Sequence, residues 1–181
     1  MKSLVTGGAG FIGSHLVEKL IEKKHKVIVL DNLTSGNLNN LKSVKNKITF
    51  VKCDLSKNKN FFNNYFKKID YVFHLAGLAD IVPSIKEPNK YFNSNVTGTL
   101  NLLEVCKKNK IKKFIYAASA SCYGIPKKYP TSEKERIDTQ YPYALTKFLG
   151  EELVMHYAKV FHMPNISLRF FNVYGPRSRT T

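Results

Sequence analysis

The segment QYPYALTKFLGEE, residues 140–152, places a tyrosine and a lysine four residues apart, directly after a proline. Pro142 favours the first turn of a helix, and in a helix Tyr143 and Lys147 lie about one turn apart on one face. An amphipathic surface helix can carry such a pair by chance. The alternative is a proton-transfer pair, in which the ammonium of Lys147 lowers the pKa of the Tyr143 phenol and makes it a general base.

A helical projection of this segment, at about 100° per residue, favours the proton-transfer pair. Gly150 falls beside Tyr143 and Lys147 and leaves room for close approach of another group. The pair flanks a predicted apolar, buried stripe made of Leu149, Leu153, Tyr157 and Val160. We therefore expect a partly buried phenol next to an ammonium, with a phenol pKa below its usual value of about 10.

A glycine-rich segment near the N-terminus has the spacing of a dinucleotide-binding loop. VTGGAGFIGSHL, residues 5–16, contains Gly8-x-Gly10-x-x-Gly13 and also Gly7-x-x-Gly10-x-x-Gly13. It follows a predicted strand and opens a predicted helix, as the dinucleotide motif requires. Its glycines allow a tight turn, close approach of the backbone to a pyrophosphate, and close packing of helix on strand, while the helix N-terminus offers free N–H groups.

Acidic and small residues follow the next strands in positions that suit the same cofactor. Asp31 ends the run VIVLD about twenty residues after the loop, where a carboxylate accepts hydrogen bonds from the adenosine ribose. No arginine adjoins Asp31, so NAD is favoured over NADP. Asp54, in CDL, would either meet the adenine amino group or start a turn. The small residues of HLAG, His74–Gly77, would let the cofactor lie close to the backbone.

Short β-branched runs alternate with longer amphipathic segments along the chain. Strands are predicted at Leu4–Thr6, Lys26–Leu30, Ile48–Lys52, Tyr71–Leu75, Lys113–Ala118 and Ile166–Phe170. Helices are predicted at Phe11–Lys23, Phe61–Phe66, Pro88–Asn109 and Pro142–Phe161, the third with Val96, Leu100 and Leu103 on its core side. This alternation predicts an α/β fold: a Rossmann-type, doubly wound parallel sheet with helices on both faces. The long polar loop Gly124–Gln140 is a candidate lid.

The composition narrows the classes of function. The net charge is +16, but the basic residues are 25 lysines and only 4 arginines, spread along the chain, so we expect no specific nucleic-acid binding. The positive charge could still attract anionic substrates. The spacing of histidines, cysteines and acidic residues predicts no metal site. No apolar run approaches the roughly 20 residues of a membrane span and the N-terminus does not look like a secretory signal, so no membrane partner and a cytoplasmic location are expected.

Taken together, the motifs resemble the extended short-chain dehydrogenase/reductase superfamily, within its NAD-dependent nucleotide-sugar epimerase/dehydratase group. The resemblance extends over nearly the whole chain and includes the segments TGGAGFIG, HLAG, NVTGTLNLLE, AASASCYG, Tyr143-x-x-x-Lys147 and RFFNVYGP. It implies an NAD-binding domain over residues 1–175 and, at 176–181, the start of a substrate domain that is largely absent from this chain. It also implies a homodimer formed through the helices that carry Asn95 and Tyr143.

The same resemblance assigns roles to individual residues. Tyr143 would be the general base, Lys147 would orient the nicotinamide ribose and tune Tyr143, and Ser119 would complete the catalytic group. The substrate would meet Ser84, Ser119, Ser121, Tyr143 and Asn172. The cofactor would meet Gly7, Gly10, Phe11, Ile12, Gly13, Asp31, Asn32, Ser35, Gly36, Asp54, Leu55, Leu75, Ala76, Gly77, Asn95, Ala117, Tyr143, Lys147 and Phe170.

The residues after Ser119 help to choose the reaction. Dehydratases of the group carry two carboxyl residues there, whereas Ala120 and Ser121 provide none and resemble the Ser-Ala-Thr segment of 4-epimerases. We therefore expect NAD-dependent epimerisation at C4 of a UDP-hexose or UDP-N-acetylhexosamine through a 4-keto intermediate. The alternatives are an NAD-binding module without turnover and a nucleotide-sugar dehydratase or 4-keto reductase.

Overall fold

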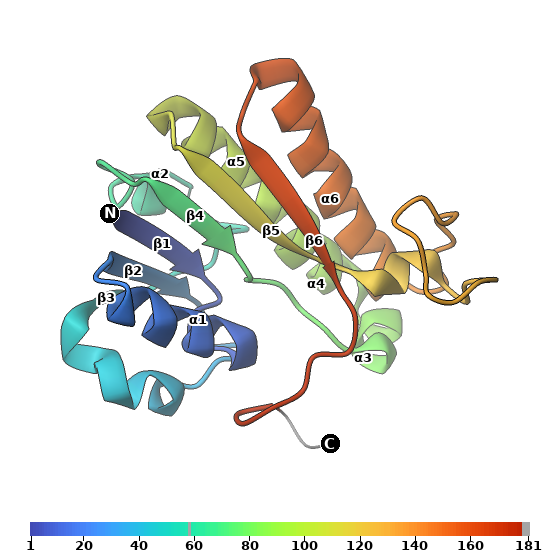
Figure 1. Cartoon of the computed structure of the whole chain (residues 1–181), viewed down its shortest axis with the longest axis horizontal. Coiled ribbons are helices and arrows are strands. Elements are labelled where there is room, and N and C mark those ends of the chain that lie inside the picture. The colour runs from blue at the N-terminus through green and yellow to red at the C-terminus, as the bar shows by residue number, and fades with distance from the viewer. Residues whose placement is uncertain (58, 179–181) are drawn as a thin grey trace.

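Six parallel strands form one sheet in the computed structural model, which describes residues 1–57 and 59–178 (Figure 1). The strand order is β3-β2-β1-β4-β5-β6, and every neighbouring pair is parallel. The strands are β1 (Lys2–Thr6), β2 (Lys26–Asp31), β3 (Ile48–Lys52), β4 (Tyr71–His74), β5 (Lys113–Ser119) and β6 (Asn165–Phe170). The predicted Rossmann-type fold is confirmed.

The chain reverses its direction of travel across the sheet at β1. From β1 it winds outward to β2 and β3, and then returns to add β4, β5 and β6 on the other side of β1. The carboxyl ends of β1 and β4 therefore lie at a topological switch point, where connecting loops diverge and leave a crevice. The fold places the glycine loop after β1 and the HLAG segment after β4 at this one point.

Helices cover both faces of the sheet, but not to the same extent (Figure 1). One face packs on α1 (Phe11–Glu22) and the 3₁₀ helix η1 (Leu38–Lys47), around Val5, Val17 and Leu41. The other face packs on α2 (Lys59–Asn63), α5 (Gly98–Asn109) and α6 (Pro142–Phe161), around Leu4, Phe114 and Val154. On the α1 side, no described helix covers β6, where the side chains of Ile166 and Leu168 are exposed.

Several short elements differ from the sequence prediction. The helix predicted at Pro88–Asn109 consists of α4 (Pro88–Phe92), a π-helical segment η2 (Asn93–Thr97) and α5. A π-turn carries an extra residue per turn and often occurs at functional sites. The structure also contains α3 (Ile81–Lys86), η1 and the 3₁₀ helix η3 (Ala120–Tyr123), none of which was predicted, and the helix predicted at Phe61–Phe66 is the shorter α2.

The buried face of α6 overlaps only in part with the face that the helical projection predicted. Tyr157 is buried and Leu153 packs against the core as predicted, but Val160 is 48% exposed, and Lys147, Gly150 and Val154 are also buried. Lys147 therefore lies within the buried stripe and not beside it, whereas Tyr143 is partly buried. Leu100 on α5, predicted to face the core, is likewise partly exposed, because the π-turn before it shifts the phase of the helix.

Two further expectations concern the limits of the fold. None of the helices in the described part of the chain is long and apolar enough to cross a bilayer. The domain boundary expected near residue 175 stays a prediction, and residues 179–181 of the expected substrate region lie outside the described residues.

Candidate active site

A pocket of about 250 Å³ opens at the carboxyl ends of β1, β2, β4 and β5. Most residues that the sequence assigned to a cofactor meet in its wall. They are Gly7, Gly10, Phe11, Ile12, Gly13, Asp31, Asn32, Ser35, Asp54, Leu55, Leu75, Ala76, Gly77 and Ala117. The wall also includes residues that sequence reasoning missed, namely Leu30, Thr34, Cys53, Ser56, Leu78, Ala79 and Ser94. All seven lie within two residues of predicted ones, and Ser94, from the π-turn, directly precedes the predicted Asn95.

The glycine loop is packed too tightly for side chains at two positions. Gly7 has φ +68°, and a Cβ there would lie 2.6 Å from the backbone nitrogen of Ala76. At Gly13, a Cβ would lie 2.2 Å from the carbonyl oxygen of Gly7. Because these neighbours are backbone atoms, neither clash can be relieved by a side-chain rotation. The loop brings the start of α1, whose N-cap Gly10 has no side-chain cap, to the pocket wall.

Asp31 is held in a fixed orientation at the end of β2. Its side chain is buried, with Oδ2 accepting from the backbone N–H of Ala9 at 2.9 Å and Oδ1 from that of Leu33 at 2.8 Å. Each oxygen retains a further lone pair that can accept from a ligand hydroxyl. Gly36 approaches the same carboxylate, because a Cβ there would lie 2.9 Å from Oδ1.

Asp54 starts a turn and also lines the pocket. Its Oδ1 accepts from the backbone N–H of Ser56 at 3.0 Å and from the Ser56 hydroxyl at 2.7 Å, which is the geometry of a turn start. The residue is part of the pocket wall, and its contact with an adenine amino group stays a prediction.

Ser119 and Tyr143, two of the predicted catalytic residues, lie at the ends of two elements. Ser119 is the last residue of β5 and caps η3, and Tyr143 lies in the first turn of α6. The hydroxyls of Ser119 and Tyr143 are joined by a hydrogen bond, and the hydroxyl of Ser121 donates to Ser119 Oγ at 2.8 Å. Three hydroxyls thus form a chain beside the pocket residue Ala117.

The expected depression of the Tyr143 pKa is wrong for the chain by itself. Burial raises the pKa of Tyr143 above its ordinary value, and the hydrogen bond from Ser119 offsets only part of this effect. Helical spacing placed Lys147 next to Tyr143, but it could not show how deeply the phenol is buried. Desolvation penalises the phenolate more than the hydrogen bond favours it.

Lys147 is buried without a carboxylate partner of its own. Its Nζ donates to the carbonyl oxygen of Ala117 at 2.5 Å and lies 4.4 Å from the centroid of the Tyr116 ring. The nearby carboxylate of Glu151 is bound by Arg169, whose Nε lies 3.0 Å from both of its oxygens. Burial consequently lowers the pKa of Lys147 to about 8, and Glu151 offsets only part of the shift.

This pKa predicts a pH dependence of stability. Between the folded pKa of about 8 and the unfolded value of 10.5, the unfolded chain binds more protons at Lys147 than the folded chain. The free energy of unfolding should therefore rise with pH across this window, by up to about 1.4 kcal/mol per pH unit. Urea unfolding of the chain without NAD, from pH 7 to 9.5, measures the slope. Lys147→Met should lack this contribution, so parallel profiles for the two proteins would contradict it.

The remaining predicted residues lie around the pocket in different ways. Asn95 is buried in the π-turn, where Oδ1 accepts from Leu78 N at 2.8 Å and Nδ2 donates to Thr146 Oγ1 at 3.0 Å. It thereby ties the pocket wall to α6. Phe170 pairs with Ser119 across β5 and β6. Ser84 is buried and donates to Ile81 O at 2.6 Å, Asn172 is exposed beyond β6, and neither lies in the wall of this pocket.

Comparison with known proteins agrees with this site. Residues 3–181 match the family described as NAD dependent epimerase/dehydratase. A UDP-glucose 4-epimerase of Lactobacillus helveticus is 37% identical, over 98% of this chain and 53% of its own length. A UDP-N-acetylglucosamine 4-epimerase structure from Methanobrevibacter ruminantium is 38% identical with a TM-score of 0.93, over 98% of this chain and 57% of that one.

One similar solved structure is that of an enzyme named for a different reaction. A dTDP-glucose 4,6-dehydratase from Streptomyces venezuelae, with NAD bound, is 29% identical with a TM-score of 0.93 and covers 98% of this chain and 57% of its own. The chain thus spans little more than half the length of these relatives. The glycine loop at the switch point and the Ser119–Tyr143–Lys147 group agree with this match, which extends along nearly all residues of the chain. The chain therefore belongs to the NAD-dependent epimerase/dehydratase family.

Proposed function

We propose that this chain is the coenzyme-binding and catalytic part of an NAD-dependent nucleotide-sugar 4-epimerase. The observation that carries the proposal is the hydroxyl chain of Ser121, Ser119 and Tyr143 beside the pocket, with Ala120 completing a segment that has no carboxyl group. Hydroxyls can relay and remove a proton from a sugar hydroxyl. Water elimination in the dehydratases needs an additional acid and base, which this segment does not supply.

The pocket residues fit NAD on the geometry of this chain. The glycine loop leaves no space for a side chain at Gly7 and Gly13, so the backbone can approach a pyrophosphate. Asp31 is oriented by two backbone N–H groups and retains lone pairs for the adenosine ribose. NAD, when bound, would accept a hydride from the sugar and later return it.

The catalytic residues would manage the proton and the orientation of the sugar. Tyr143 would take the proton of the C4 hydroxyl, with Ser119 as the hydrogen-bond partner that keeps the phenol in place. Because burial raises the pKa of Tyr143, a cationic group must be added before the phenol can act as a base near neutral pH. Lys147 retains two N–H donors beyond its bond to Ala117, and these can reach a ribose. Rotation of the 4-keto sugar before the hydride returns would give the C4 epimer.

The test is to supply UDP-hexoses to the chain loaded with NAD. We expect absorbance of the reduced nicotinamide to appear on mixing with UDP-glucose or UDP-galactose and both C4 epimers to accumulate without net NADH consumption. Stoichiometric NADH consumption by a 4-keto sugar would instead indicate a reductase. Loss of water from the sugar would indicate a dehydratase, and NAD binding without reduction by any UDP-hexose would indicate a binding module. Each of these three results would overturn the epimerase proposal.

Asp31 should determine the choice of coenzyme. Asp31→Asn is expected to weaken NAD binding by about tenfold or more, because a charge-assisted hydrogen bond to the ribose contributes about 1.5–3 kcal/mol. Binding of NADP should be weaker than that of NAD in the wild type, and the difference between the two affinities should be smaller in Asp31→Asn. Calorimetric titration with both coenzymes measures this, and Asp54→Asn serves as comparison. Equal losses for both coenzymes in Asp31→Asn would contradict the assigned role.

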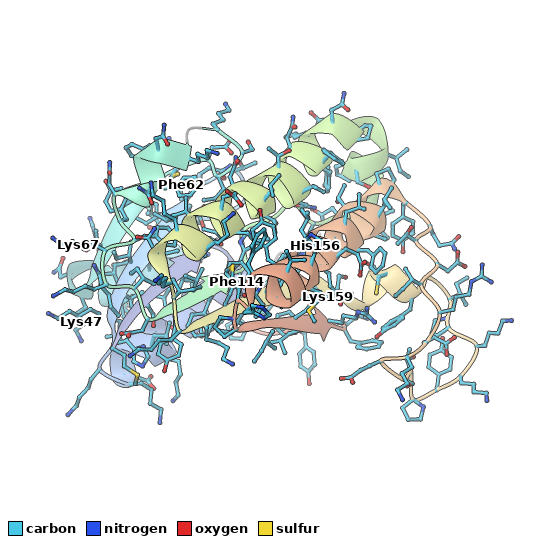
Figure 2. The ribbon with its side chains drawn as sticks, turned by 90° about the horizontal axis from the view of Figure 1, so that it is seen from above. Lys47, Phe62, Lys67, Phe114, His156 and Lys159 are labelled. Atoms are coloured by element: carbon cyan, nitrogen blue, oxygen red, sulfur yellow. The ribbon has the colours of Figure 1, made fainter. Side chains whose placement is uncertain are left out.

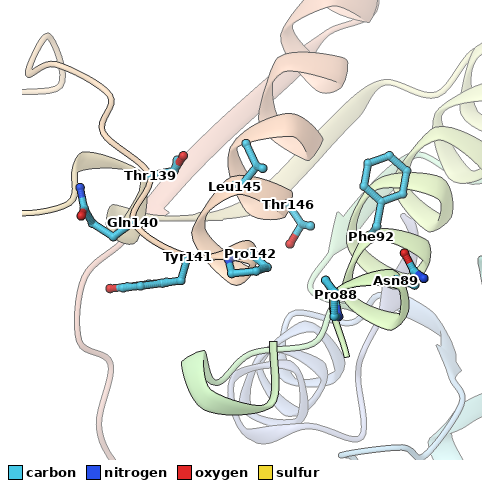
Figure 3. Close-up of a pocket in the computed structure, with 9 residues that line it drawn as sticks. All are labelled: Pro88, Asn89, Phe92, Thr139, Gln140, Tyr141, Pro142, Leu145 and Thr146. Carbon is cyan, nitrogen blue, oxygen red and sulfur yellow. The ribbon is translucent and has the colours of Figure 1, made fainter. Parts of the chain in front are cut away.

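We also propose that the chain forms a homodimer through α4, α5 and α6, as the family resemblance implies. A pocket of about 430 Å³ opens on this surface between the start of α6 and α4 (Figure 3). Its wall includes Phe92 and Leu145, which are both large, apolar and exposed, and exposed Leu100 and Met155 lie on α5 and α6. Sedimentation of the wild type and of Leu145→Glu tests this. A dimer that Leu145→Glu splits is expected, and a monomeric wild type would contradict it.

A further inference from the structure

Eleven of the 25 lysines of this chain lie at the edge of the sheet opposite to the active-site pocket. They stand at the amino ends of the strands or in the loops that enter them, whereas the pocket lies at the carboxyl ends and has Asp31 and Asp54 but no lysine in its wall. Two of them, Lys47 and Lys67, lie on the same side of the molecule in Figure 2. The full set is Lys2, Lys23, Lys24, Lys26, Lys45, Lys47, Lys67, Lys68, Lys110, Lys112 and Lys113.

The register of the sheet lines up part of this set in a row. Lys2 on β1 is the direct partner of Lys26 on β2. Lys47 directly precedes Ile48, which pairs with Val27, so Lys47 lies beside Lys26 on its other side. Neighbouring strands are about 4.8 Å apart, so these three backbone positions follow one another across the edge at roughly that spacing. The Lys2 side chain reaches on to the carbonyl oxygen of Lys67, at 2.9 Å, which brings the loop before β4 into the row.

Little negative charge compensates this edge. Among the described residues, Asp70 is the carboxylate at the strand starts, and it is already bound by Lys112 Nζ at 2.7 Å and by the backbone N–H of Lys2. Glu22, at the end of α1, is paired with Lys19. No ion pair of the described residues includes Lys24, Lys26, Lys47 or Lys67, and all four are exposed. The remaining lysines are spread over the rest of the chain, whereas this edge combines adjacent lysines with few carboxylates.

We propose that this lysine edge binds a single-stranded nucleic acid through its phosphate backbone, without base specificity. A row of ammonium groups complements a chain of phosphates, and such binding is driven by counterion release. Lysines act as point charges and this edge contains no arginine, so it has no bidentate groups for reading bases. A lipid surface fits less well, because this edge offers Met1 as its large exposed apolar side chain and no apolar helix face to insert.

The experiment uses the whole chain and a fluorescently labelled, uridine-only RNA 20-mer, with polarisation measured over a range of salt concentrations. The triple variant Lys26→Glu, Lys47→Glu, Lys67→Glu removes the centre of the edge. The matched control, Lys127→Glu, Lys128→Glu, Lys134→Glu, makes the same change of net charge in the exposed loop before α6. Unlabelled polyphosphate is the competitor, and NAD titration verifies that both variants are folded.

We expect the edge variant to bind RNA at least tenfold more weakly than the wild type and the control variant within threefold of it. If three phosphate contacts are lost, the slope of log affinity against log salt should fall by about 2, since each contributes about 0.7 for a single strand. Competition by polyphosphate is expected, because the edge would contact the phosphate chain and not the bases, and its absence would overturn the proposal. Equal losses in both variants, or no RNA binding at physiological salt, would overturn the proposal. Lysine-dependent binding to phosphatidylserine vesicles without RNA binding would overturn it in favour of a membrane surface.

Discussion

Replacing Tyr143 by phenylalanine should reduce C4 epimerisation by roughly 10²–10⁴-fold while NAD binding stays within about threefold, because a positioned general base contributes about that much to the rate. The substitution removes only the hydroxyl that is hydrogen-bonded to Ser119 and leaves the buried ring in place. Ser119 cannot replace it, since an aliphatic hydroxyl is a much poorer acid than a phenol. The measurement is single-turnover reduction of bound NAD by a UDP-hexose, followed by analysis of the sugar product.

Tyr141 provides the matched control for this variant. It is the N-cap residue of the same helix and lines the pocket between α4 and α6 (Figure 3). Tyr141→Phe should therefore leave the rate of NAD reduction within about threefold of wild type. Wild-type turnover in Tyr143→Phe would refute its assignment as the base. If wild type and both variants bind NAD but none reduces it, the result supports an NAD-binding module without turnover and contradicts the epimerase proposal.

The parts of the site that the sequence predicted are those built from local backbone geometry. The glycine loop, Asp31 and HLAG each follow a strand directly, so once the parallel sheet is assumed their carboxyl-end location follows. The structure brings all three to one pocket wall. The central strands β1 and β2 were predicted because strands buried on both faces are short, continuous apolar runs that leave a strong sequence signal.

The parts that could not be predicted depend on packing between distant segments. The helical projection treated Lys147 as polar and so placed the α6 core stripe too far toward Val160, which is exposed. The spacing of residues shows that a charge lies near Tyr143 but not how deeply the phenol is buried. The pKa of Tyr143 was therefore expected to fall, whereas burial raises it. The contact of Asn95 with a cofactor stays a prediction, but the hydrogen bonds of its amide to Leu78 and Thr146 depend on a π-turn that has no recognisable sequence pattern.

Gly150 illustrates how such packing can be tested, and Gly150→Ala is expected to destabilise the chain by about 1–2 kcal/mol. A Cβ at this position would lie 2.3 Å from the Tyr116 hydroxyl and 3.0 Å from the carbonyl oxygen of Asn95. Alanine in a helix interior gains about 1 kcal/mol over glycine, but overpacking of a tight core costs about 1–3 kcal/mol and occasionally more. We expect the cost of the clash to exceed the gain from alanine, because the ring of Tyr116 is almost fully buried and cannot move aside.

A second substitution separates this clash from other effects of the methyl group. Tyr116→Phe removes the atom nearest to the new Cβ and, alone, should cost about 1 kcal/mol through loss of its hydrogen bond to Lys147 O at 3.3 Å. In the double variant the clash is partly relieved, so the two costs should fall short of additivity by at least about 1 kcal/mol in a urea-unfolding cycle. Gly98→Ala on α5 is the control, since the nearest atom to its Cβ is at 3.4 Å, an ordinary contact, and it should be neutral or stabilising. Strict additivity would show that Gly150 is required for a reason other than the approach of Tyr116. Additive costs combined with a loss of NAD affinity would point to the position of Lys147 on the same turn of α6, whose ammonium rests on the Tyr116 ring.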